Sequence, residues 1–148
     1  MLGKLKKLFE SKEEIKKDNY INKNLYLLIY EIIVADHNID DREINLTSEL
    51  IEKYFDIRKD INVSELRKLQ NENHFNPDLT NIAYQLKNHL PYEKRKYLIL
   101  ICWQVLLIDE EEDIFETSIV RKIAVLLGIE DNDFISIRNK VKNDISSR

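Results

Sequence analysis

The sequence predicts an all-α fold, a single-domain helical bundle of about seven helices. Hydrophobic residues make up 43% of the 148 positions, which is too many for a disordered chain and enough for one buried core. The chain has only two Gly and two Pro, too few for the tight turns of an all-β protein. Apolar residues also recur at helical spacing along most of its length.

An internal repeat adds a fourth observation. Three carboxylates recur at a constant shift of 73 positions: Asp36, Asp40 and Glu43 match Asp109, Asp113 and Glu116. The apolar run over residues 25–35 recurs with the same shift over residues 98–108. We therefore expect two copies of one unit, at about residues 22–73 and 95–143, related by an approximate two-fold axis.

The elements of the first half follow in order. Residues 1–17 form a lysine-rich helix, and a nearly all-apolar helix runs from about Asn22 to His37. Asp40 as N-cap and Glu43 three positions into the helix predict a capping box, which opens a helix ending at Phe55. Asn62 and Glu65 indicate the start of a short helix that ends near Asn73.

The second half repeats this plan after a connecting helix. Asn76-Pro77 predicts the start of the connecting helix, which ends near Pro91. Pro91 then opens a helix to about Ile108, and Asp113 with Glu116 predicts another capping box. That next helix ends at Leu127-Gly128, where Gly suits the left-handed C′ position. Asp131 or Asn132 begins the last helix. We expect the core to include Leu28, Ile32, Ile101 and Leu107.

The first 17 residues differ in charge from the domain expected over residues 18–148. They hold six Lys and three Glu, a net charge of +3, with Leu2, Leu5, Leu8 and Phe9 on one face. Such a helix could contact an anionic membrane or an acidic partner. It could equally pack on the bundle with its lysines in solvent, and this is the arrangement we expect, because three Glu dilute the charge.

Composition also excludes several classes of function. The remaining residues carry a net charge of −7, which argues against nucleic-acid binding. No phosphate-binding Gly loop, nucleophile elbow or Cys–His pairing is present, so we expect no enzyme activity. The single cysteine, Cys102, allows no internal disulfide, and no secretory signal is visible. We therefore expect a cytoplasmic protein.

The acidic turns allow two interpretations. Asp40, Glu43, Asp113 and Glu116 are explained by helix capping, but Asp36 and Asp109 lie where the helix dipole disfavours a carboxylate. A bound hard cation such as Ca²⁺, Mg²⁺ or Mn²⁺ would compensate for that cost, although no EF-hand loop is present. The run Glu110–Glu112 beside Asp109 is more typical of a solvated or partner-binding surface than of a metal site.

These motifs resemble the TerB family, the tellurite-resistance helical domain. The resemblance rests on an apolar helix ending in Ala35-Asp36, the following turn, and the repeat of both before the Leu127-Gly128-Ile129 step. It covers about residues 22–141 and extends to a related domain that precedes the J-domain in some co-chaperones. The sequence departs from the family at His37 and Glu110, where Gly is frequent.

The resemblance implies a non-catalytic, stress-associated domain whose acidic turns bind a divalent metal. Carried over residue by residue, the metal-binding positions are Asp36, Asp40, Glu43, Asp109, Asp113 and Glu116. The alternative is a protein-interaction module, a co-chaperone adaptor or immunity-like protein, whose acidic face binds a basic protein partner. We expect a protein partner and no nucleic acid.

Overall fold

The computed structural model describes residues 2–35, 38–72, 78–108 and 114–147. These residues form seven α-helices and no strand, which confirms the predicted all-α fold. In chain order the helices are α1 (Leu2–Val34), α2 (Asp41–Phe55), α3 (Lys59–Glu72), α4 (Leu79–His89), α5 (Tyr92–Leu106), α6 (Ile114–Leu126) and α7 (Asp131–Ser146). No helix of this described part is both long enough and apolar enough to cross a bilayer.

Helix α1 is one continuous helix of 33 residues, which corrects the prediction of two helices over residues 1–17 and 22–37. Neither Gly nor Pro lies between residues 17 and 22, so nothing there ends the helix. The helix ends at Val34, slightly before the predicted His37.

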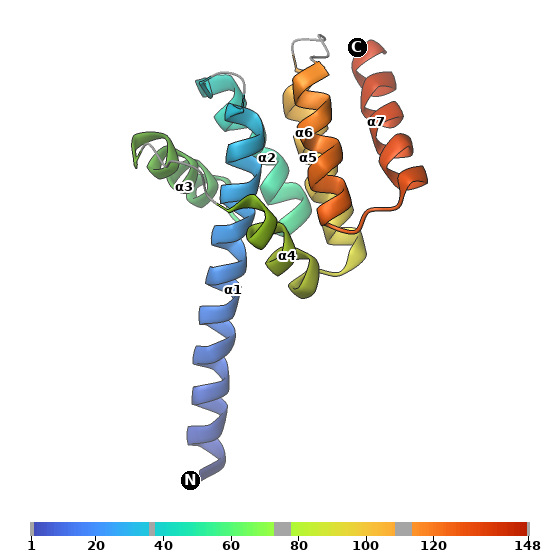
Figure 1. Ribbon diagram of the computed structural model, residues 1–148. Coiled ribbons are helices and arrows are strands. Elements are labelled where there is room, and N and C mark those ends of the chain that lie inside the picture. The colour runs from blue at the N-terminus through green and yellow to red at the C-terminus, as the bar shows by residue number, and fades with distance from the viewer. Residues whose placement is uncertain (1, 36–37, 73–77, 109–113, 148) are drawn as a thin grey trace.

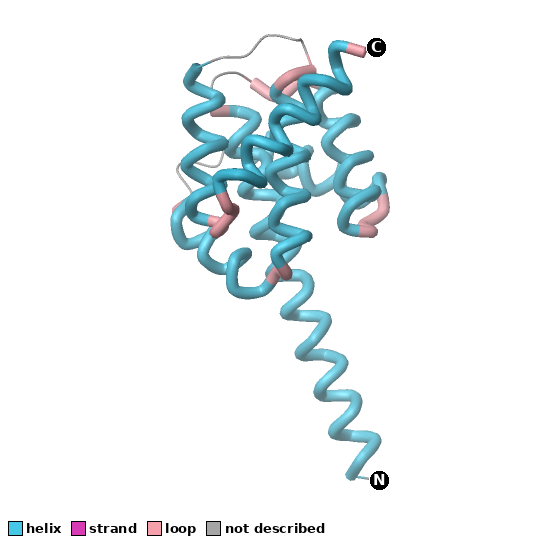
Figure 2. Tube along the Cα trace, turned by 90° about the vertical axis from the view of Figure 1, so that its right-hand side faces the viewer, coloured by secondary structure: helices cyan, strands magenta, loops and turns pink. Residues whose placement is uncertain are grey.

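The two halves of α1 have opposite environments. Residues 21–34 enter the bundle, whereas the preceding part projects away from it in both views (Figures 1 and 2). Leu2, Leu5, Leu8 and Phe9 are 85%, 54%, 59% and 65% exposed. The prediction that this lysine-rich segment packs on the bundle was therefore wrong, because none of the other helices extends to where it lies.

The core is built around the second half of α1 and α5, which pack against each other. Helices α3, α4 and α6 also pack on α1, while α2 and α7 pack on α5. The four predicted core residues are confirmed: Leu28, Ile32, Ile101 and Leu107 are each at most 4% exposed. Cys102 is fully buried beside them, and desolvation raises the pKa of its thiol to about 12.

Burial repeats with the same shift as the sequence. Six buried positions of α1 (Leu25, Tyr26, Leu28, Ile29, Ile32, Ile33) match six buried positions of α5, each 73 residues later (Leu98, Ile99, Ile101, Cys102, Val105, Leu106). Both α2 and α6 end in a left-handed residue, Asp56 with φ 56° and Gly128 with φ 72°. The two units therefore share one burial pattern, and their two-fold relation remains a prediction.

Helix α6 ends as the sequence predicts. The N–H of Ile129 donates to the carbonyl of Ala124 at 2.9 Å, and that of Gly128 donates to Val125 at 3.0 Å. This pair of bonds is a Schellman motif, in which Gly adopts the left-handed conformation without a Cβ clash.

Two helix starts differ from the prediction. Helix α3 begins at Lys59, and Asn62 is an interior residue with no exposed surface. The Lys59 amide donates to the Glu52 carboxylate of α2 at 2.6 Å, so a neighbouring helix satisfies this end. Helix α4 begins at Leu79 with Asp78 as N-cap, and the predicted Asn76-Pro77 start lies outside the described residues.

Candidate functional site: the acidic turns

The first acidic turn lies between the end of α1 and the start of α2. Asp40 is the N-cap of α2, with the extended backbone that this position requires. Its Oδ1 accepts the Glu43 N–H at 2.7 Å, and Glu43 Oε1 accepts the Asp40 N–H at 3.1 Å. The predicted capping box is therefore confirmed, and it engages one oxygen of each carboxylate.

Helix α3 braces this turn from the side. The Gln70 side-chain amide donates to the carbonyl of Ile39 at 3.1 Å. Arg67, one turn earlier, pairs with Asp41 at 2.8 Å and donates to Gln70 at 3.3 Å. These bonds hold the extended residues before α2 in place, and the pairing with Arg67 offsets the charge of Asp41.

Asp40 and Glu43 differ in their access to solvent. Asp40 is exposed, whereas Glu43 is only 4% exposed. Asp40 is therefore the carboxylate of the capping box that solvent reaches.

The other four predicted site residues lie outside what the structure describes. Asp36, Asp109 and Asp113 fall in the segments that are not described, and so does His37. Glu116 belongs to α6, but its side chain is not described. The prediction that six carboxylates bind a metal is therefore untested, and within the described ranges no group of three His, Cys, Asp or Glu side chains is arranged to hold a metal ion.

The helix ends that flank the two turns face the same end of the bundle. The end of α1, the start of α2, the end of α5 and the start of α6 all lie opposite the projecting N-terminal segment (Figure 1). The C-terminal end of α7 lies there as well. The described helix ends on either side of the two turns are thus at one end of the molecule.

A buried polar centre joins α1, α2 and α3, and sequence reasoning missed it. The Tyr26 hydroxyl donates to Asn62 Oδ1 at 2.6 Å. Asn62 Nδ2 donates to the carbonyls of Ser48 at 3.0 Å and Ile57 at 2.8 Å. Burial, with Glu65 as a smaller cause, raises the pKa of Tyr26 to about 12. A usable signal existed, since Asn62 shares a helix face with Leu66 and Leu69.

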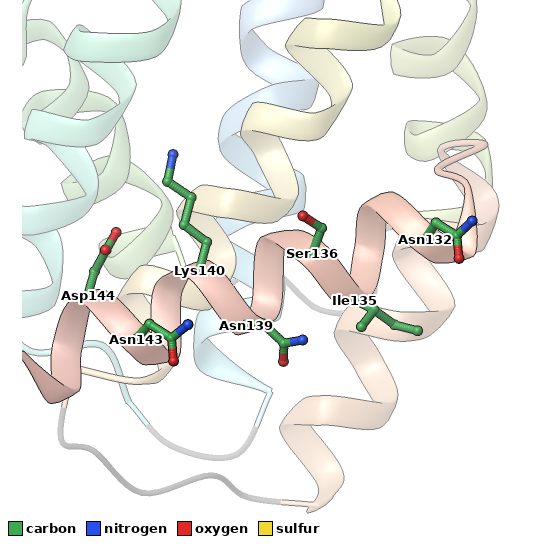
Figure 3. A pocket seen from close by; sticks show the side chains of 7 residues that line it. All are labelled: Asn132, Ile135, Ser136, Asn139, Lys140, Asn143 and Asp144. Carbon is green, nitrogen blue, oxygen red and sulfur yellow. The ribbon is translucent and has the colours of Figure 1, made fainter.

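The surface of α7 carries a hollow of about 600 Å³, shown in Figure 3. Its seven lining residues all come from this one helix: Asn132, Ile135, Ser136, Asn139, Lys140, Asn143 and Asp144. Their side chains spread along the helix and do not converge on a point (Figure 3). Such an open row can contact a surface but cannot surround a small ligand.

Comparison with known proteins gives one match. A family model described as tellurite resistance protein TerB matches residues 22–139. The matched region contains both acidic turns and begins where α1 enters the bundle. Neither a curated protein nor a solved structure matches the chain.

Proposed function

Because the chain belongs to the tellurite resistance protein TerB family, we propose that it is a non-catalytic, stress-associated domain whose duplicated acidic turns bind a divalent cation. The observation that carries this proposal is the extent of the match, which spans both copies of the acidic motif. The shared burial pattern of α1 and α5 supports it, because it gives both motifs the same place after a buried helix.

The chemistry of the six carboxylates suits a hard cation. Oxygen ligands favour Ca²⁺, Mg²⁺ or Mn²⁺ over metals that prefer nitrogen or sulfur. Asp40 Oδ1 is occupied by the capping box, so Asp40 would bind an ion through Oδ2. A bound cation would also offset the unfavourable interaction of Asp36 and Asp109 with the negative ends of their helices.

Calorimetric titration with Ca²⁺, Mg²⁺ and Mn²⁺ tests the proposal. The wild-type protein should bind one of these ions, and the Asp36→Asn/Asp109→Asn variant should lose that binding. The Glu10→Gln/Glu14→Gln variant is the matched control, because it removes two carboxylates from the exposed part of α1 and should bind as wild type does. An unchanged titration of the Asp36/Asp109 variant would contradict the proposal.

A protein-interaction module is the second candidate. Its support is the net charge of −7 outside residues 1–17, together with the capping role that already accounts for Asp40 and Glu43. In this candidate the acidic end of the bundle binds a basic protein surface. Absence of any heat with the three ions, together with salt-sensitive binding to a basic partner, would favour it over the metal proposal.

A further inference from the structure

The exposed part of α1 is an unpartnered amphipathic helix. Every described side chain from Leu2 to Tyr20 is exposed, and the segment projects clear of the other helices (Figures 1 and 2). Leu2, Leu5, Leu8 and Phe9 therefore lie in solvent, although burying such side chains is favourable. The family match begins only at residue 22, so this segment is an addition to the domain that the family defines.

Lysines lie at the edges of this apolar face, and most of the acidic residues lie away from it. At about 100° per residue, Leu2, Leu8 and Phe9 lie within about 60° of Leu5 around the helix axis. Lys4 and Lys6 flank the face on its two sides. The first nine residues contain three Lys and no acidic residue. Lys7, Glu10 and Glu14 lie on the opposite side of the helix, and Glu13 lies beside the apolar face one turn or more beyond Phe9.

We propose that residues 2–17 dock on an anionic lipid surface. Leu2, Leu5, Leu8 and Phe9 enter the interface between headgroups and acyl chains, and Lys4 and Lys6, which flank this face, reach the lipid phosphates. An anionic lipid surface attracts a lysine-rich segment electrostatically. A membrane interface also requires no shape complementarity, so a short apolar face is sufficient for docking. From Phe9 to the first bundle residue, Ile21, the helix rises about 18 Å, so the bundle lies beyond the docked segment along the helix axis.

A second copy of the chain is a less suitable occupant. Lys12 and Lys16 lie close to the direction of Leu5 and continue the apolar face as a positive one. Two such faces packed in parallel would bring lysines of both chains into contact, and packed antiparallel they would place the lysines of each chain against the apolar residues of the other. Four apolar side chains also fall short of the roughly 800 Å² that each partner contributes to a stable protein interface.

Vesicle flotation with the full-length chain tests the proposal. The protein should float with vesicles of phosphatidylcholine and phosphatidylserine at low salt, and it should not float with phosphatidylcholine alone. High salt should weaken the binding, because ions screen the lysines. Failure to bind the anionic vesicles at low salt would overturn the proposal.

Two variants separate the contribution of the apolar side chains to vesicle binding from that of the lysines. Leu5→Ser/Leu8→Ser/Phe9→Ser and Lys4→Gln/Lys6→Gln should each weaken binding by about tenfold or more. The matched controls change exposed residues elsewhere, Tyr84→Ser/Val125→Ser for the apolar set and Lys122→Gln/Lys140→Gln for the lysines, and should bind as wild type does. Circular dichroism should show the same folded bundle in all of them.

Three outcomes would contradict the membrane role. Equal vesicle binding by the apolar variant would mean that residues 2–17 do not insert. Self-association of the wild type that the apolar variant abolishes, without vesicle binding, would assign the face to a second copy. Binding to an acidic protein but to no vesicle would assign it to a protein partner.

Discussion

Asn62 holds three helices together through one side-chain amide. It accepts from Tyr26 of α1 and donates to the carbonyls of Ser48 in α2 and Ile57 just after it. All its amide groups are desolvated, since the residue has no exposed surface. A buried amide with this many bonds fixes how α3 sits against α1 and α2, because each partner would be left unpaired in any other arrangement.

Replacing Asn62 by Ala should therefore destabilise the protein by about 2–4 kcal/mol. The loss includes three hydrogen bonds and the cost of leaving the Tyr26 hydroxyl buried without its acceptor. Denaturant unfolding monitored by circular dichroism measures this change. Asn71→Ala, at an exposed position of the same helix, should change stability by no more than about 0.5 kcal/mol. Equal losses of stability in the two variants would show that the buried amide of Asn62 stabilises the protein no more than an exposed one.

At the scale of the element, α1 combines two kinds of helix without a break. Its second half is buried by α3, α4, α5 and α6, and tertiary packing stabilises it. Its first half has no such support and depends on helix propensity and on continuity with the buried half. A Leu→Ala substitution should therefore destabilise the protein strongly in the second half of α1 and hardly at all in the first half.

Leu28→Ala should cost about 2–5 kcal/mol of unfolding free energy, because Leu28 is fully buried and its removal leaves a cavity. Leu5→Ala in the exposed half should stay within about 0.5 kcal/mol of wild type. Chemical denaturation of both variants checks the difference. A cost above about 2 kcal/mol for Leu5→Ala would mean that the first half packs on the bundle after all.

The capping box of α2 gives a second prediction at this scale. Asp40→Ala should destabilise the protein by about 1 kcal/mol, because the Glu43 N–H loses its acceptor. Asp40→Asn should retain most of the stability, since Asn is an equally good N-cap. Thermal unfolding without added metal compares the two, and equal losses would mean that the charge of Asp40 matters more than its capping bond.

Across the whole molecule, the sequence was sufficient for the fold class, the core and most helix ends. The apolar positions that recur at helical spacing in the sequence are the positions that the structure buries, because the apolar face of a helix packs against neighbouring helices. The matched burial of α1 and α5 is an example. Local capping signals such as Asp40-Glu43 and Gly128 were equally informative.

Features that depend on contacts between distant residues could not be predicted. Nothing local reveals that Glu52 caps α3, that Arg67 and Gln70 brace the first acidic turn, or which groups Asn62 binds. The continuity of α1 was missed for a different reason: a change in composition after residue 17 was interpreted as a boundary, although no helix-breaking residue is present. At the candidate site, the sequence predicted the capping box correctly. Metal binding by the six carboxylates remains a prediction.

The most direct measurement of the central claim is thermal unfolding with and without millimolar Ca²⁺, Mg²⁺ or Mn²⁺. An ion at 100 times its dissociation constant stabilises a folded site by about 2.7 kcal/mol, which corresponds to a rise in Tm of about 5–11 °C for a chain of this size. Wild type should show this rise with at least one ion, and Asp36→Asn/Asp109→Asn should not. A wild-type Tm that no divalent ion raises, or an equal rise in the variant, would contradict cation binding at the acidic turns.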